Sequence, residues 1–390
     1  MKRNIRRVVV LLVLFSLGDL TTTSAQEWFK GALHIHSLWS DGNNFPEVIA
    51  EYYKERGYNF LTVTEHNAMQ IGTGWASIKP GSSTKRNMFD HYLQRFGEDW
   101  VEYTRFPNDS IRVRLKALAE YRSHVEQPGK FLLVNGEEIT SPFEKTVPVH
   151  VNAFNTTNVI SKKTGKSRSE VMENAVNAVL EQGTLTGKTV FSFINHPNFY
   201  WALNAADIMN VNDVHFLEIF NAGSTGNYGD DEHENVEDMW DQINVRRVLD
   251  GRPLLYGVAT DDMHGLNQAD RAWVMVSATS LHADRLAEAM LLGDFYASTG
   301  VYLETVEANR KRLAIKVKKE ENVNYKIVFL GVRRGEDRTT VFSEVEGEEA
   351  SYILCDDDLF VRAKIISSRL HKNPFQKGDT EVAWTQPICH

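Results

Sequence analysis

Histidine and carboxylate residues recur in this sequence directly after short apolar runs. The nine candidates for metal binding are His34, His36, Asp41, His66, Glu138, His150, His196, Asp262 and His264. Imidazole combined with carboxylate suits Zn, Mn or Fe. Carboxylates held close together repel one another and tend to protonate, and bound divalent cations remove that repulsion. The residue types therefore predict a divalent metal site.

Two spacings strengthen this prediction. His34 and His36 are two residues apart, as are Asp262 and His264. In an extended strand, such pairs lie on the same face and can hold one ion between them. Glu138 and Asp262 each have an identical neighbour in the chain, which leaves an ambiguity of one residue. The Gly-x-Glu and Asp-x-His spacings favour Glu138 and Asp262, and Glu65 is expected to support the ligands rather than bind metal.

The candidate ligands follow apolar runs typical of strands that are buried on both faces. Such runs stand at residues 32–33, 60–63, 131–134, 190–194, 216–220 and 254–259. Helical patterns stand at residues 46–56, 114–125, 170–180, 236–249 and 283–292. The alternation predicts an α/β fold with a parallel sheet or barrel. Residues that follow the strands of a barrel converge on one mouth, where we expect the metal site.

Two segments depart from this alternation. Residues 300–390 contain strand candidates at 312–317, 325–330, 351–354 and 359–366, and no good helix, which predicts a small antiparallel β-module. Residues 70–110 are irregular, and an irregular stretch of this length is usually a functional lid or a mobile insertion.

The first 25 residues have the pattern of a secretory signal peptide. Four basic residues precede the ten-residue apolar run 8–17, and small residues follow near Ala25. The run is too short to span a bilayer, which disfavours the alternative of a membrane anchor. The predicted organisation is a signal peptide at 1–25, a metallohydrolase barrel at 27–299 and the β-module at 300–390, with the mature protein periplasmic or secreted.

The composition narrows the partners. The chain has 43 Lys and Arg against 52 Asp and Glu, and the leader holds four of the basic residues and one acidic residue, so its removal changes the formal charge from −9 to −12. This charge disfavours nucleic acid, and no second apolar run suggests a membrane. Cys355 and Cys389 are too few for a thiolate zinc site, and the sequence leaves open whether they pair. We expect a small-molecule substrate, while the oligomeric state is not predicted.

The ordered motifs resemble the PHP (polymerase and histidinol phosphatase) superfamily over about residues 30–300. They are His34-x-His36 with Ser40-Asp41-Gly42, Thr64-Glu65-His66-Asn67, Gly136-x-Glu138, His150, His196-Pro197 and Asp262-x-His264. The exported, β-rich tail resembles the branch that includes carbaryl hydrolase. The resemblance implies a distorted (β/α)7 barrel, here followed by the antiparallel β-module, and two or three divalent ions of Zn, Mn or Fe. The amidohydrolase barrel, which also opens with His-x-His, is the structural rival.

The resemblance also implies how the ligands are shared. His34, His36, Glu138 and Asp262 would hold the first ion. Glu138 would bridge to a second ion at His150 and His196. Asp41, His66 and His264 would hold a third, and because some family members carry His in place of Asp41, this ion is expected to be held differently or more weakly.

The expected function is that of an exported metal-dependent hydrolase, most simply a phosphoesterase acting on small phosphate esters through a multinuclear metal-bound hydroxide. Glu138, Asp262 and His264 are the expected catalytic residues, and Arg271 and Asn221 are candidates for substrate binding. The first alternative is a carbamate, ester or amide hydrolase. Aromatic residues near the ligand segments would suit its substrates or belong to the core; they are Trp39, Phe199, Tyr200 and Trp201. The second alternative is a non-catalytic binding protein.

Overall fold

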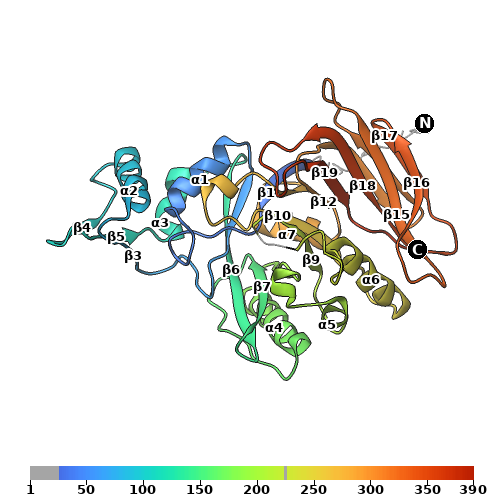
Figure 1. Cartoon of the computed structure of the whole chain (residues 1–390), viewed down its shortest axis with the longest axis horizontal. Coiled ribbons are helices and arrows are strands. Elements are labelled where there is room, and N and C mark those ends of the chain that lie inside the picture. Colours follow the sequence, from blue (N-terminus) through green and yellow to red (C-terminus); the bar gives the residue numbers. More distant parts are fainter. Residues whose placement is uncertain (1–25, 224–225) are drawn as a thin grey trace, which may run out of the picture.

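The computed structural model describes residues 26–223 and 226–390, so the predicted signal peptide lies outside the described residues. It shows a mixed α/β fold built on a large central sheet (Figure 1). Within the described part of the chain, no helix combines the length and apolar character needed to cross a membrane.

The central sheet contains thirteen strands, of which nine come from the first three hundred residues. These are β1 (Glu27–Ala32), β2 (Phe60–Val63), β6 (Leu132–Phe143), β7 (Val147–Phe154), β8 (Phe191–Ile194), β9 (Phe216–Asn221), β10 (Tyr256–Thr260), β11 (Trp273–Ala278) and β12 (Phe295–Ser298). The order is β10-β9-β8-β7-β6-β2-β1-β11-β12-β19-β18-β15-β16. Strand β7 runs antiparallel to both neighbours, and β11 runs antiparallel to β1. The sheet is therefore mixed, whereas the sequence predicted a parallel one.

The ends of β1 and β10 approach each other although no ladder joins these two strands in the sheet order. An isolated parallel bridge links Ile35 and Met263. The backbone N–H of His36 donates to the carbonyl of Met263 at 3.0 Å. This bridge brings the two segments that carry His-x-His and Asp-x-His together.

Five helices pack against the sheet at positions close to those predicted. They are α1 (Pro46–Glu55), α3 (Leu118–Val125), α4 (Arg168–Thr186), α6 (Val236–Leu249) and α7 (Ala283–Leu291). The short helix α5 (Ala205–Met209), which was not predicted, packs against α6 and α4. Helix α4 begins where the Ser167 side chain accepts a hydrogen bond from the N–H of Glu170 and ends at the left-handed Gly187. The helix predicted from residue 114 begins only at Leu118, because the preceding residues form a strand.

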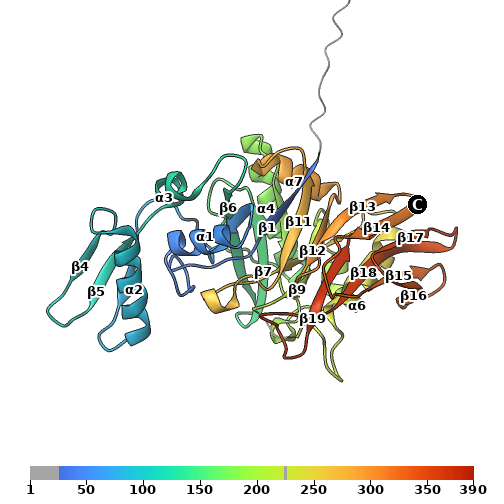
Figure 2. The same ribbon diagram turned by 90° about the horizontal axis from the view of Figure 1, so that it is seen from above.

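The segment predicted to be irregular is an ordered subdomain, so that prediction is wrong. It contains β3 (Gly74–Ile78), α2 (Ser83–Phe96), β4 (Tyr103–Arg105) and β5 (Ile111–Leu115). Its three strands form a separate sheet that encloses a small core with Phe89 and Tyr92 of α2. Figures 1 and 2 place this subdomain at one end of the molecule, far from the C-terminal strands.

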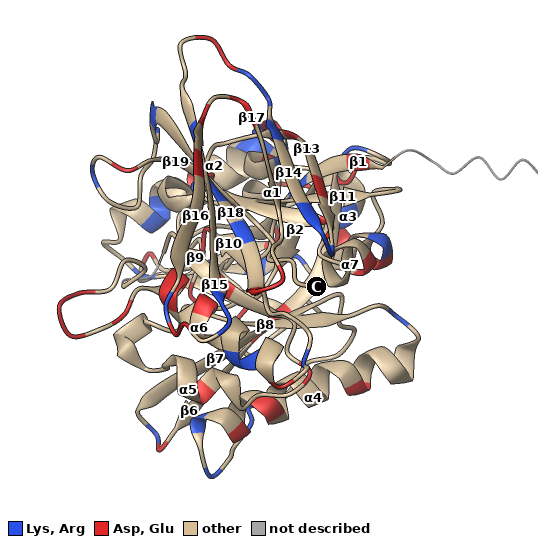
Figure 3. Cartoon of the chain, turned by 90° about the vertical axis from the view of Figure 1, so that its right-hand side faces the viewer, with Lys and Arg blue, Asp and Glu red and all other residues tan. Residues whose placement is uncertain are grey.

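The last ninety residues are all strands and turns. The strands are β13 (Leu303–Asn309), β14 (Arg312–Val317), β15 (Tyr325–Arg333), β16 (Thr340–Glu346), β17 (Glu349–Ile353), β18 (Asp358–Leu370) and β19 (Thr380–Thr385). All of their pairings are antiparallel, as predicted. Figure 3 shows that these strands carry both basic and acidic residues. Because β19 also pairs with β12, the main sheet continues into this region, and the boundary at residue 300 stays a prediction.

Candidate metal centre

The structure brings all nine predicted ligands into one cluster at the carboxyl ends of the central strands. Most of them lie in the loops that follow β1, β2, β8 and β10, while Glu138 and His150 lie within the β6–β7 hairpin. The antiparallel register of this hairpin places His150 opposite Thr140, two residues from Glu138. Loop residues and hairpin residues therefore meet at one mouth.

A first group of four side chains surrounds a common point. The Nε2 atoms of His34 and His36 lie 3.3 Å from Oδ1 of Asp262. The same two nitrogens lie 3.5 and 3.3 Å from Oε2 of Glu138. Two imidazoles and two carboxylates at these separations match the donor set that the resemblance implied for the first ion.

Glu138 also faces a second group through its other oxygen. Its Oε1 lies 2.9 Å from Nδ1 of His150 and 3.4 Å from Nε2 of His196. Asn195 donates to the same oxygen at 2.8 Å. One carboxylate thus stands between two sets of imidazoles, which is the position of a bridging ligand.

The third group lies nearest to solvent. Oδ2 of Asp41 is 3.4 Å from Nε2 of His66, and Oδ1 is 3.3 Å from Nε2 of His264. The side chains of Asp41, His66 and His264 are 55%, 25% and 30% exposed, whereas those of the first group are at most 11% exposed. This group forms the open side of the cluster.

The buried atoms of the cluster fit divalent metal ions. Four polar atoms are enclosed by protein and make no hydrogen bond to the described residues: His34 Nε2, His36 Nε2, Glu138 Oε2 and His150 Nδ1. Buried polar atoms in folded proteins nearly always have a partner. The two Nε2 atoms face Glu138 Oε2, and His150 Nδ1 faces the other oxygen of Glu138. A bound cation would supply the partner that each of the four atoms lacks.

The cluster strongly shifts the protonation of its members. Burial lowers the pKa of His34, but Asp262, Glu138 and Glu218 outweigh it and raise that pKa well above its ordinary value. Burial also lowers the pKa of His66, and the nearby carboxylates of Asp41 and Glu138 raise it to about 10. Burial raises the pKa of Glu138, and the surrounding imidazoles, His150 first, bring it well below its usual range. Metal binding must therefore displace protons from the imidazoles.

These shifts predict a pH dependence for the metal-free protein. A histidine whose pKa is higher in the folded than in the unfolded chain stabilises the fold below the unfolded value, and this contribution is lost as pH rises through the folded value. For His66 the window runs from its ordinary value of 6.5 to about 10. Urea unfolding of chelator-treated protein should show stability falling across this window, and a smaller fall for His66→Gln. Constant or rising stability would contradict the prediction.

A second carboxylate behind the cluster orients two of its members. Glu218 in β9 accepts from Nδ1 of His34 at 2.9 Å and from the backbone N–H of His196 at 2.6 Å. The hydroxyl of Thr260 donates to it as well. Such a bond leaves Nε2 of His34 free of a proton and pointing into the cluster. No role was assigned to Glu218 from the sequence.

Substitution of Glu218 by Gln is expected to weaken metal binding by roughly 10–100-fold, the usual cost of losing a residue that hydrogen-bonds to a metal ligand. The amide keeps the size of the side chain but removes the charge that holds His34. Competition with a metallochromic chelator measures the change. Glu234→Gln, a half-buried change outside the cluster, is the control, and equal affinities in the two variants would contradict this role.

The structure separates the members of each acidic doublet. Glu137 points away from the cluster and accepts from the backbone N–H of Ile160 at 2.7 Å. Asp261 accepts from three backbone N–H groups and from the hydroxyl of Tyr53. Glu138 and Asp262 face the imidazoles, as the spacing suggested. Glu65 lies outside the cluster and accepts from Ser37, Ser40 and Gln70, so it fixes the loop that carries His36 and Asp41.

The two candidates for substrate binding have different surroundings. Asn221 donates to Glu218 at 2.8 Å and to Oδ2 of Asp262 at 3.1 Å, so it lies directly behind a predicted ligand. The guanidinium of Arg271 donates to the carbonyl of Ala222 at 3.0 Å and to Asn373 at 3.2 Å. These contacts hold a loop, and a role of Arg271 in substrate binding stays a prediction.

An aromatic turn, Phe199–Trp201, borders the cluster. The Phe199 ring lies 5.1 Å from the ring of His196 and 6.2 Å from that of His150. Tyr200 is 77% exposed, and both Tyr200 and Trp201 have positive φ angles, which are strained for aromatic residues. Trp201 stacks on His233 with the ring centres 4.1 Å apart. The turn therefore presents an exposed aromatic ring at the rim of the cluster.

Comparison with known proteins gives only distant structural likenesses. No model of a protein family and no curated protein matches the chain. A two-domain protein from Bacteroides vulgatus containing a predicted PHP-like metal-dependent phosphoesterase matches 93% of this chain and 95% of its own, with 13% identity and a TM-score of 0.41. A protein from Bifidobacterium adolescentis assigned as a metal-dependent phosphoesterase and an amidohydrolase from Chromobacterium violaceum each match 60% of this chain and 87% of their own, at 13% and 12% identity and TM-scores of 0.28 and 0.31.

Proposed function

We propose that this chain is a metal-dependent hydrolase of the PHP superfamily that cleaves small phosphate esters. The observation that carries the proposal is the position of Glu138, whose two oxygens face two separate sets of imidazoles. Divalent ions, when bound, supply Lewis acidity and allow water to act as a nucleophile at neutral pH. The bridge between Ile35 and Met263 supports a distorted seven-stranded barrel, which it would close.

The nine residues have separate roles in this proposal. His34, His36, Glu138 and Asp262 would hold one ion, and Glu138 would share a second with His150 and His196. The more exposed group of Asp41, His66 and His264 would hold a third and lies where a substrate can approach. Asp262 and His264 lie between the buried groups of side chains and this open side, which is why we assign them, with Glu138, as catalytic residues.

The third group should lose its ion first. Its three side chains are the most exposed of the cluster, so water and a chelator reach them most easily. Stepwise treatment with a chelator, followed by elemental analysis, should show one ion per chain leaving before the others. His264→Ala should bind one ion fewer than the parent. Release of all ions in a single step would contradict this order.

One observation favours hydrolysis of a carbamate, ester or amide instead. The exposed aromatic turn, Phe199–Trp201, stands beside His150 and His196 and would suit an aromatic or neutral leaving group. This alternative, which would agree with the carbaryl-hydrolase-like branch, uses the same ligands. A non-catalytic binding protein is the remaining alternative.

A substrate panel distinguishes these proposals. The purified protein is stripped of metal, reloaded separately with Zn, Mn or Fe, and offered p-nitrophenyl phosphate, bis-p-nitrophenyl phosphate, aryl carbamates and aryl esters at equal concentration. Faster hydrolysis of the phosphate esters supports a phosphoesterase, and faster hydrolysis of the carbamates or esters supports the alternative. Metal binding without hydrolysis of any substrate would favour the binding protein.

We also propose that residues 1–25 are removed during export and that the mature protein is periplasmic or secreted. The basic start, the ten-residue apolar run and the small residues before residue 26 support this. Mass spectrometry of the protein recovered outside the cytoplasm should give the mass of a chain that lacks these residues. A full-length chain held in the membrane fraction would overturn the proposal.

A further inference from the structure

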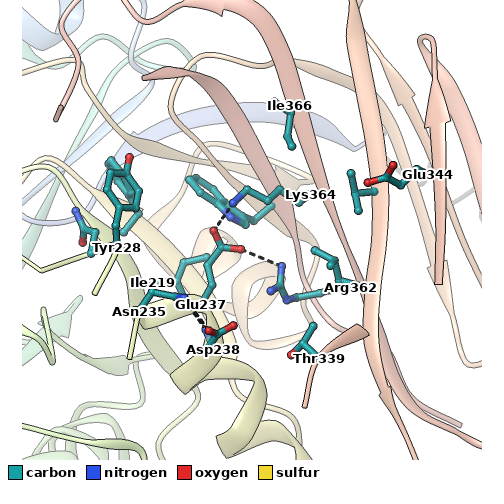
Figure 4. Close-up of a pocket in the computed structure, with 15 residues that line it drawn as sticks. Ile219, Tyr228, Asn235, Glu237, Asp238, Thr339, Glu344, Arg362, Lys364 and Ile366 are labelled. Atoms are coloured by element: carbon teal, nitrogen blue, oxygen red, sulfur yellow. Dashed lines mark hydrogen bonds and ion pairs between the residues drawn. The ribbon is translucent and has the colours of Figure 1, made fainter. Parts of the chain in front are cut away.

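A cavity of about 440 Å³ lies between the β9–α6 region and the C-terminal strands, and none of the nine predicted metal ligands lines it. On one side it is lined by residues of β9 and the first turns of α6, and on the other by residues of β15, β18 and β19 (Figure 4). Its volume falls within the roughly 300–1,000 Å³ typical of small-molecule sites. Residues from before and after position 300 therefore line the same pocket.

The polar floor of the cavity is a fixed set of ion pairs. Glu237 of α6 accepts from Nζ of Lys364 at 2.5 Å and lies 3.3 Å from Nη1 of Arg362. Arg362 also makes two 2.7 Å hydrogen bonds to Asp241. Figure 4 shows Glu237 between the two cations. The side chains of Glu237 and Lys364 remain 20% and 28% exposed, so both can still contact a ligand.

The charge of the lining disfavours anions. Both cations are already neutralised by carboxylates, and two further acidic side chains, Asp238 and Glu344, line the same cavity. An anion would meet this acidic excess. A zwitterion would have to compete with the ion pair between Lys364 and Glu237. A purely apolar ligand would strip water from that pair without replacing its hydrogen bonds.

The remaining lining is apolar and aromatic. Ile219, Leu330 and Ile366 contribute aliphatic surface, and Tyr228 and Trp384 contribute aromatic rings. Nζ of Lys364 lies 5.7 Å from the centre of the Trp384 ring. Polar groups that both donate and accept thus stand next to an apolar wall.

We propose that this cavity binds a neutral saccharide unit. The C–H face of a sugar ring would pack on the apolar wall. Its hydroxyl groups would donate to Glu237 and Asp238 and accept from Lys364, without disturbing the ion pairs. Such a ligand uses both halves of the lining and brings no charge into an acidic cavity. This site is separate from the metal cluster and does not depend on the reaction proposed for it.

Calorimetric titration of the mature protein, residues 26–390, tests the proposal. The probes are glucose, galactose, mannose, N-acetylglucosamine, maltose and cellobiose, with inorganic phosphate and putrescine as charged comparisons. We expect saturable binding of at least one sugar at one site per chain. Affinity should fall tenfold or more in Lys364→Met and in Glu237→Gln, and should be unchanged in Arg246→Gln, an exposed change on the same helix.

Leu330→Phe is a further variant that fills the cavity and leaves the ion pairs in place. It should block binding even if the charge variants fold poorly. The proposal is overturned if none of the six sugars binds, if binding survives Leu330→Phe, or if only phosphate or putrescine binds in a manner that Lys364→Met abolishes.

Discussion

Glu138→Gln is expected to weaken metal binding by more than about 100-fold, with hydrolytic activity lost in parallel. Loss of a residue that only hydrogen-bonds to a metal ligand costs roughly 10–100-fold, and Glu138 is proposed as a ligand itself. Its oxygens lie 3.3 Å from His36, 2.9 Å from His150 and 3.4 Å from His196, so one carboxylate serves both buried groups. An amide of the same size offers a single neutral oxygen and cannot replace either charge. Elemental analysis after gel filtration and the rate with the best substrate of the panel measure the two losses.

The neighbouring residue provides a matched control. Burial raises the pKa of Glu137 to about 7, although its hydrogen bond from Ile160 opposes the rise. Glutamine resembles the protonated form of this residue, which faces away from the cluster. Glu137→Gln should therefore keep its metal and most of its activity. Full metal content in Glu138→Gln, or equal losses in the two variants, would overturn the assignment of Glu138 as the shared ligand.

Asp241→Ala is expected to lower the free energy of unfolding by about 3–5 kcal/mol, the usual cost of removing one partner of a buried ion pair. Asp241 is 1% exposed, and its two oxygens accept hydrogen bonds from Arg362, which is 2% exposed. Without Asp241, Glu237 at 3.3 Å would be the one carboxylate among the described residues left to balance the charge of the guanidinium. Urea unfolding followed by circular dichroism measures the loss.

An exposed ion pair on the same helix is the control for this prediction. Arg246 pairs with Asp250, and its side chain is 61% exposed. Asp250→Ala should change stability by less than about 1 kcal/mol. The double variant Asp241→Leu with Arg362→Met should recover much of the stability, because well-packed apolar residues can replace a buried ion pair. A loss below about 1 kcal/mol in Asp241→Ala would show that Arg362 finds other compensation.

The sequence predicted that these nine side chains would gather in one cluster because much of the pattern is local. His-x-His and Asp-x-His place two side chains on one face of an extended segment wherever that segment lies. The apolar runs before His66 and His196 identified buried strands, and strand ends gather at one edge of a sheet. These two rules account for the seven residues in loops that follow strands, whereas Glu138 and His150 lie within a hairpin and were recognised from the Gly-x-Glu spacing and the family resemblance.

The features that the sequence did not predict depend on tertiary contacts. The reversed direction of β7 follows from the tight β6–β7 hairpin, whose turn residues 144–146 gave no strong signal. The subdomain with β5 was missed because the alternation of Ile111, Val113 and Leu115 with two arginines lies within a polar stretch. The role of Glu218 required the distance to His34, which lies 184 residues away in the chain.

Strand β19 gives the sheet an unusual order of assembly. It lies between β12 and β18, pairing Ala297 with Trp384 on one side and Ile365 with Ala383 on the other. Strand β19 is the last strand of this sheet along the chain, so during synthesis or export it becomes available for pairing after all the others. The edges of β12 and β18 therefore stay open until residues 380–385 emerge, and open edges are templates for aggregation. Completion of the sheet thus depends on its final strand, and a chain truncated before residue 380 would leave both of these edges without their β19 partner.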